Sequence, residues 1–253
     1  MIGADFLSIF QTRALVLKTQ DYNENDKLVW LFSEKLGKIS VLAKGAKKSR
    51  SKVLPITLPF CYADFTLFKG RSMYTLNEGA IVDSFQDLLN DLDSITYGTY
   101  FCELIDISAQ AEESNRGLFK EVITAFYLLR SKALDYDLLA RAFEVKLLNY
   151  TGYGLNLDYC CECRKKINTC NYISLQYNGG VCSECNRING MFISGAAYNF
   201  INFLNKTTLD KIFRVSLSQK VKDEVYNILN SMISQNYARR PKSLETFNLF
   251  EKE

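Results

Sequence analysis

The sequence predicts a multi-domain protein of the α+β class: an N-terminal β-barrel, then an α-helical domain into which a four-cysteine metal-binding segment is inserted. Three observations lead to this prediction. About the first eighty residues contain five short β-rich runs separated by turn signals. From about residue 87 the apolar residues recur with the period of a helix. Six of the eight cysteines fall between residues 159 and 185.

The five β-rich runs are short and closely spaced, which is typical of a small barrel. Residues 63–68 alternate, with Ala63, Phe65 and Leu67 on one face of the expected strand. Gly37 stands where a hairpin would turn into the third run. Closing the sheet into a barrel removes exposed strand edges, and an SH3-like barrel is the alternative architecture. The expected strands cover residues 12–19, 27–32, 38–43, 63–68 and 73–82.

Helical runs fill most of the remaining chain. Proline and glycine are nearly absent within them, whereas Ala, Leu, Glu and Lys are common. The first three runs suggest an antiparallel bundle, and the last two complete the helical domain. The expected helices cover residues 93–110, 118–132, 138–150, 195–205 and 219–235. The predicted division is a barrel at 1–82, a helical domain at 83–158, a metal-binding segment at 159–190 and C-terminal helices at 191–253.

Charge is distributed unevenly along the chain. Residues 1–80 carry 12 basic and 7 acidic side chains, whereas residues 81–158 carry 6 and 13. This asymmetry indicates segments with different roles. No apolar run approaches the roughly 18 residues that a membrane span needs, and the N-terminus lacks the basic region of a secretion signal. We therefore expect a cytoplasmic protein with reduced thiols and no membrane partner.

The chain contains no histidine. That removes the commonest general base, together with the Ser–His and Cys–His nucleophile pairs. The stretch GAKKS, at residues 45–49, resembles a phosphate-binding P-loop but lacks its spacing. Paired acids such as Glu112 and Glu113 lie at expected helix ends or in loops. We therefore expect no enzyme and no hydrolysis of nucleoside triphosphates.

The cysteine-rich segment contains two pairs with the two-residue gap of a zinc knuckle. An interval of 18 residues separates the pairs, as in a four-cysteine zinc ribbon. Four thiolates leave no open position for water, so the expected zinc ion, one per chain, is structural. Cys161 should face away from the metal, and Cys170 has no partner at knuckle spacing. Gly179 and Gly180 should permit a tight turn before the second pair without a Cβ clash. The predicted ligands are Cys160, Cys163, Cys182 and Cys185.

A basic run follows the second expected strand. Residues 35–52 carry seven basic side chains and no acid, with small residues between the last five, so we expect a flexible loop that neutralises phosphates. The alternatives are a solvated charge run and a patch for an acidic protein. Aromatic residues such as Trp30, Phe32, Phe60, Phe65 and Phe68 could stack on bases, although strand aromatics are more often core. The candidate nucleic-acid-binding residues are Lys35, Lys38, Lys44, Lys47, Lys48, Arg50 and Lys52.

Together these features resemble the bacterial RecO family of recombination mediators over nearly the full length of the chain. The stretches that carry the resemblance are residues 12–52, FEVKLLNYTGYGLNLDYCCEC at 143–163 and NGGVCSEC at 178–185. The resemblance implies an N-terminal OB-fold barrel. It maps the family's basic loop onto Lys44, Lys47, Lys48, Arg50 and Lys52, and the family's zinc ligands onto the four cysteines given above. Arg164 stands where many members have glycine, and the first ten residues look like an extension.

The resemblance also implies a non-enzymatic role in DNA repair. Family members bind single- and double-stranded DNA, anneal complementary strands, and work with RecR to load RecA onto strands coated by single-strand-binding protein. They also contact the acidic C-terminal tail of that protein. Annealing without ATP requires two phosphate backbones to be neutralised, which suits a basic loop on a barrel. The alternative is a zinc-ribbon adaptor that binds RNA or acts in transcription.

Overall fold

The computed structural model describes residues 8–212, 215–239 and 241–243. The chain forms two compact units, one ending at Phe119 and the other beginning at Lys120. The first seven residues of the expected N-terminal extension lie outside the described residues, whereas Ile9 and Phe10 already belong to the first strand. The division groups the first helix with the barrel, and the domain bounds inferred from the sequence stay a prediction.

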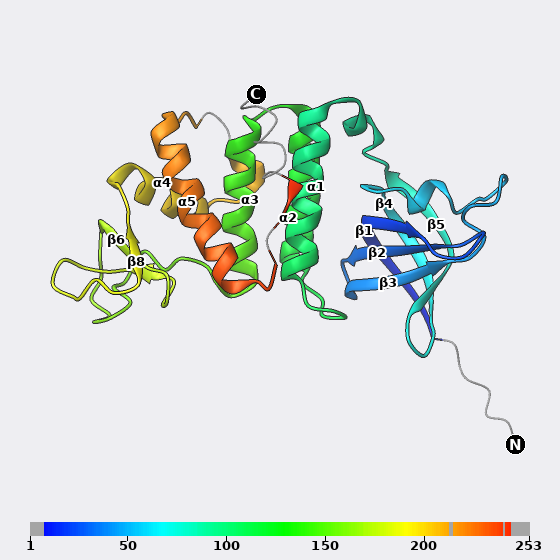
Figure 1. Cartoon of the computed structure of the whole chain (residues 1–253), viewed down its shortest axis with the longest axis horizontal. Coiled ribbons are helices and arrows are strands. Elements are labelled where there is room, and N and C mark those ends of the chain that lie inside the picture. The colour runs from blue at the N-terminus through cyan, green and yellow to red at the C-terminus, as the bar shows by residue number, and fades with distance from the viewer. Residues whose placement is uncertain (1–7, 213–214, 240, 244–253) are drawn as a thin grey trace, which may run out of the picture. The chain divides into compact units, whose positions relative to one another are not determined.

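A closed five-stranded barrel forms most of the first unit (Figure 1). Going around the barrel, the strand order is β1-β2-β3-β5-β4. The β3–β5 pair is parallel, and the other pairs are antiparallel. This is the topology of an OB-like barrel, which confirms the predicted fold class. The strands are β1 (Ile9–Asp21), β2 (Lys27–Ser33), β3 (Gly37–Ala43), β4 (Tyr62–Lys69) and β5 (Tyr74–Asp83).

The strand β1 is longer than the expected run because it pairs with two neighbours. Its first half pairs with β4, from Ile9 opposite Phe68 onward, and its second half pairs with β2. An irregularity between Val16 and Lys18 interrupts the β1–β2 register, as a β-bulge does where a strand bends. The alternation expected in β4 is confirmed: Phe65 and its neighbours on that face are buried in the barrel core.

The helix α1 (Leu92–Ser108) follows the barrel in the same unit. Its N-cap residue, Asp91, accepts a hydrogen bond from the Ser94 N–H, as expected at a helix start. Near its other end, the Asp106 carboxylate lies 2.7 Å from Lys18 Nζ and 3.7 Å from Lys38 Nζ. Ion pairs therefore join α1 to two strands of the barrel.

The second unit contains most of α2 (Arg116–Ser131) and the helices α3 (Tyr136–Tyr150), α4 (Gly195–Lys206) and α5 (Gln219–Asn236). The helix α3 contacts both α4 and α5 (Figure 1). All its residues from Leu138 to Leu148 are buried, so its polar side chains are buried too. The expected helices are confirmed, with ends that move by a few residues.

The cysteine segment lies between α3 and α4. It contains a small sheet in the order β7-β6-β8, made of β6 (Tyr172–Ser174), β7 (Gly179–Gly180) and β8 (Gly190–Phe192). Among the helices within the described residues, none combines the length and the apolar composition that a membrane span requires.

Candidate nucleic-acid interface and metal centre

The connection that follows β3 carries five of the seven predicted cations at one end of that strand. All five side chains are exposed or partly exposed, whereas Ala46 between them is fully buried. The cations can therefore face solvent while the backbone of the connection rests on the barrel. The five residues are Lys44, Lys47, Lys48, Arg50 and Lys52.

The first part of this connection is held by the turn between β1 and β2. The Gly45 N–H donates to Asp26 Oδ1 at 2.8 Å, and the Lys47 N–H donates to the Asn25 carbonyl oxygen at 3.0 Å. Gly45 has a φ of +66°, a conformation that glycine adopts at no steric cost. The expectation of a flexible loop is therefore wrong for residues 45–48, because partners far away in the sequence fix their backbone.

Asp21, the last residue of β1, accepts hydrogen bonds from two of the cations around this turn. Its carboxylate oxygens lie 2.8 Å from Lys47 Nζ and 3.0 Å from Lys27 Nζ. These two ammonium groups lower the pKa of Asp21, so the carboxylate is ionised near neutral pH. Lys27 was not among the predicted residues, because it lies outside the basic run and no local spacing links it to Lys47.

The other two predicted cations lie at the opposite end of β3. That strand has seven residues, so its ends are about 20 Å apart. Lys38 donates to the Asp106 carbonyl oxygen as well as pairing with its carboxylate. Lys35 is exposed, and its Nζ donates to the Gln11 carbonyl oxygen at 3.0 Å. The structure therefore does not bring all seven cations together.

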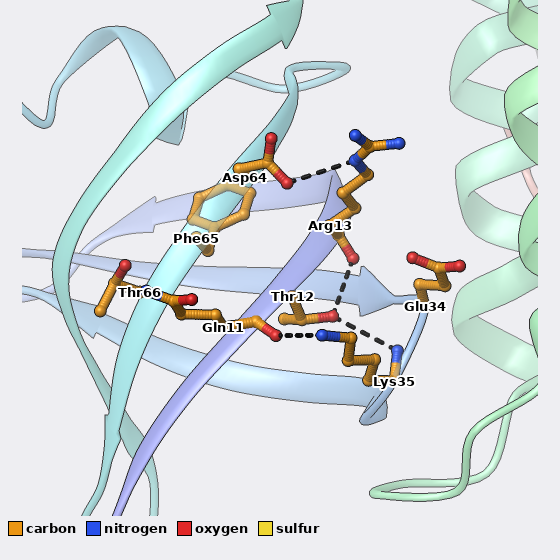
Figure 2. Close-up of a pocket in the computed structure, with 8 residues that line it drawn as sticks. All are labelled: Gln11, Thr12, Arg13, Glu34, Lys35, Asp64, Phe65 and Thr66. Atoms are coloured by element: carbon orange, nitrogen blue, oxygen red, sulfur yellow. Dashed lines mark hydrogen bonds and ion pairs between the residues drawn. The ribbon is translucent and has the colours of Figure 1, made fainter.

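Lys35 lines a pocket of about 350 Å³ on the outer face of the barrel (Figure 2). The pocket also contains Glu34 and an ion pair between Arg13 and Asp64, whose Nε and Oδ1 are 3.3 Å apart. Figure 2 shows the Lys35 ammonium turned back to the backbone of β1. Two acids and two bases give the pocket no excess positive charge, so it does not extend the basic surface of the connection after β3.

Most of the strand aromatics belong to the interior. Phe32, Phe60 and Phe65 are at most 3% exposed and so cannot stack on bases. Trp30 is half-buried, and Lys18 Nζ lies 4.9 Å from the centre of its ring. Phe68 is also half-buried. Base stacking on the barrel therefore has little support from these side chains.

The two cysteine pairs converge on one point. The Sγ atoms of Cys160, Cys163, Cys182 and Cys185 all lie within 4.8 Å of one another. The Cys182 N–H approaches Cys160 Sγ at 3.4 Å. An ion pair also joins the two knuckles: Lys165 Nζ, after the first cysteine pair, lies 2.6 Å from Glu184 Oε2, between the two cysteines of the second pair. Four soft sulfur donors arranged in this way fit a zinc ion.

Hydrogen bonds within this cluster change the acidity of its thiols. Burial acts to raise the pKa of Cys160, but hydrogen bonds from backbone N–H groups, including those of Cys163 and Cys182, bring it down to about 6. Hydrogen bonds with the thiols of Cys163 and Cys182 raise the pKa of Cys185 to about 12. Four thiolates this close together repel, and a divalent cation at their centre would remove that repulsion.

The neighbouring cysteines lie outside the cluster, as predicted. Cys161 Sγ points to the Gly179 carbonyl oxygen, and Cys170 is buried beside Gly180. The two glycines lie in the strand β7 rather than in a turn, and neither has a positive φ. The expected steric reason is confirmed at Gly180, where a Cβ would lie 2.7 Å from Ile167 Cδ1 and 2.9 Å from Cys170 Sγ.

Arg164 completes the first knuckle in the conformation for which glycine is favoured. Its φ is +62°, and its N–H donates to the Cys160 carbonyl oxygen at 3.0 Å. The turn therefore forms with arginine, at a conformational cost of about 1–2 kcal/mol for a residue with a Cβ.

Comparison with known proteins agrees with this geometry. The model "Recombination protein O N terminal" matches residues 7–85, and "Recombination protein O C terminal" matches residues 89–245. The chain is 54% identical over 247 residues to "DNA repair protein RecO" of Clostridium acetobutylicum, covering 98% of this chain and all of that protein. Identity to the protein of the same name from Clostridium novyi is 53% over 251 residues, covering 99% and 98% of the two chains. The chain therefore belongs to the RecO family of DNA repair proteins.

Proposed function

We propose that this protein is a non-enzymatic recombination mediator that binds single- and double-stranded DNA. The observation that carries the proposal is the docked basic connection: five cations that reach solvent follow β3 on an OB-like barrel. OB folds commonly bind oligonucleotides through their strands and adjoining loops. Lysine and arginine side chains at the surface neutralise phosphates without reading the sequence.

Strand annealing is the reaction that this arrangement suits. Two complementary strands repel through their phosphates, and a surface that neutralises both lowers that barrier without ATP. The sequence has no P-loop spacing that would bind a nucleoside triphosphate. The relatives are named for DNA repair, which fits annealing as a step in repair.

The other parts of the chain have supporting roles in this proposal. The four-cysteine cluster holds one structural zinc ion, and the cysteine segment at 159–190 depends on it for its fold. With RecR, the protein helps to load RecA onto strands coated by single-strand-binding protein, whose acidic tail it contacts. The barrel at 1–82 binds DNA, and the helical parts at 83–158 and 191–253 form the scaffold. The protein works in the cytoplasm, at the nucleoid.

The test is annealing of complementary strands, bare and coated with single-strand-binding protein, in the absence of ATP. We expect annealing of both at low salt, and suppression at high salt because counterion release drives binding. Deleting the acidic tail of the single-strand-binding protein should slow annealing of coated strands far more than annealing of bare ones, since the tail recruits the mediator.

Two results would count against the proposal. Equal slowing of both reactions would contradict recruitment through the tail. No annealing of bare strands at low salt would contradict the mediator role. Tighter binding to RNA than to DNA at matched salt would then favour an adaptor that acts on RNA or in transcription.

A further inference from the structure

We propose that Lys27 and Lys47 form a phosphate-binding site that the carboxylate of Asp21 fills in the free protein, and that a phosphodiester of DNA displaces this carboxylate on binding. The proposal rests on the DNA-binding role given above and adds two residues to it. Lys27 becomes a DNA-binding residue, and Asp21 becomes an internal competitor that sets the affinity.

The geometry at Asp21 is that of an anion held between two cations. Asp21 and Lys27 are cross-strand partners at the end of the β1–β2 pair, and Lys47 reaches them from the connection after β3. Each carboxylate oxygen takes one ammonium group, at 2.8 Å and 3.0 Å. A phosphodiester also presents two anionic oxygens, so it can accept the same two hydrogen bonds.

Exposure shows that the anion lies on the solvent side of this pair of lysines. The side chain of Asp21 is 59% exposed, whereas those of Lys47 and Lys27 are 32% and 17% exposed. An outside anion can therefore reach the ammonium groups once the carboxylate rotates away. Lys44 and Lys48, both exposed on the same connection, add positive charge beside Asp26 in the adjoining turn.

The connection keeps its place without help from Asp21. Its backbone is fixed by the bonds from Gly45 to Asp26 and from Lys47 to Asn25, and by the buried Ala46. The Lys47 backbone therefore stays in place when Asp21 leaves, and its side chain can still reach an anion held by Lys27. Exchange of one anion for another requires only side-chain rotation.

The energetic consequence is a modest, local weakening of DNA binding. Exposed ion pairs contribute little, so Asp21 is a competitor that DNA can displace. The Lys47 and Lys27 ammonium groups lower the pKa of Asp21, so the competitor stays charged across neutral pH. A lone anion benefits little from displacing it, whereas a strand whose next phosphates also reach Lys44 and Lys48 binds through several ion pairs at once. The device thus favours runs of phosphates over single anions.

The test compares two acid-to-amide substitutions in one turn. Asp21→Asn removes the competitor, whereas Glu24→Gln removes the same formal charge from an exposed residue that forms no ion pair within the described part of the chain. Binding of the full-length protein to a single-stranded oligonucleotide is measured at low and moderate salt. We expect Asp21→Asn to strengthen binding about 3- to 10-fold, and Glu24→Gln to strengthen it clearly less.

A second pair of variants separates local exchange from general charge. In a protein carrying Lys27→Gln and Lys47→Gln, adding Asp21→Asn should change affinity no more than adding Glu24→Gln does. Equal effects of Asp21→Asn and Glu24→Gln in the otherwise wild-type protein would overturn the proposal. So would weaker binding by Asp21→Asn, which would mean that Asp21 positions the lysines.

Failure of this proposal can be distinguished from failure of the DNA-binding role. If Lys47→Glu with Lys48→Glu leaves DNA affinity unchanged, the connection after β3 is not the DNA-binding site, and both proposals fall. If that double substitution weakens binding while Asp21→Asn and Glu24→Gln behave alike, only the exchange at Asp21 is overturned.

Discussion

The cysteine segment and the basic connection after β3 are both short runs rich in one kind of side chain, but their side chains behave in opposite ways. In the cysteine segment, two distant pairs converge until four sulfurs lie within 4.8 Å. In the basic run, Lys35 and Lys38 lie at the opposite end of β3 from the five cations of the connection, and Lys47 of that connection pairs with Asp21. Thiolates can share one divalent ion, whereas like charges on lysines repel. The position of a four-cysteine site can therefore be predicted from the spacing of its own ligands. The role of each lysine depends instead on the residues that lie beside it in the fold.

The largest effect on folding should come from removing one cysteine of the four-cysteine cluster. Cys182→Ser should lose most of about one zinc per chain, by elemental analysis, and should unfold the cysteine segment, because metal binding and folding are coupled. Cys161→Ser and Cys170→Ser are the matched controls and should keep the metal. Loss of zinc in Cys170→Ser but not in Cys182→Ser would make the ligand assignment wrong.

The second-largest effect should be a difference in DNA affinity between charge reversals at the two ends of β3. Lys48→Glu and Lys35→Glu reverse the same charge on exposed residues about 20 Å apart. Lys48→Glu should weaken binding to every DNA sequence alike and make the dependence of log affinity on log salt shallower, by about 0.7–0.9 for each phosphate that the variant no longer neutralises. Lys35→Glu should do so less. A larger effect of Lys35→Glu would place the DNA at the other end of the barrel.

A smaller effect is expected at Lys38, which the sequence grouped with the DNA-binding cations. Because its ammonium pairs with Asp106 of α1, Lys38→Met should lower the free energy of unfolding by about 1 kcal/mol, measured by urea denaturation. DNA affinity should change much less than in Lys48→Glu. A loss of DNA binding with unchanged stability would mean that Lys38 contacts DNA after all.

The smallest effect is expected at Arg164 in the first knuckle. Arg164→Gly should raise the stability of the metal-loaded protein by up to about 1 kcal/mol, since glycine relieves the left-handed conformation but gains freedom in the unfolded chain. Lys166→Gly is the control, because Lys166 has no positive φ and should only lose stability. If Arg164→Gly is the more destabilising of the two, the arginine side chain itself supports the turn.

Local spacing predicted much of this molecule, and long-range partners account for what it missed. The four-cysteine cluster follows from two short turns, and the strands and helices follow from their own hydrophobic periods. The backbone of residues 45–48 is held by Asn25 and Asp26. The Lys38 ammonium is held by Asp106, 68 residues away in the sequence. No period or motif encodes such pairings. The basic run was therefore predicted as one flexible surface, although its cations lie at two opposite ends of β3.

The contacts between α1 and the barrel limit where this protein can be truncated. Family matches change over between residues 85 and 89, but the compact unit continues to Phe119. A fragment that stops at residue 85 would leave Lys18 and Lys38 without Asp106, and the buried ring of Phe32 without the ring of Phe119, 5.8 Å away. The boundary between the two family matches is thus not a boundary between folded units, and a fragment meant to keep the barrel folded should retain α1 and the residues up to Phe119.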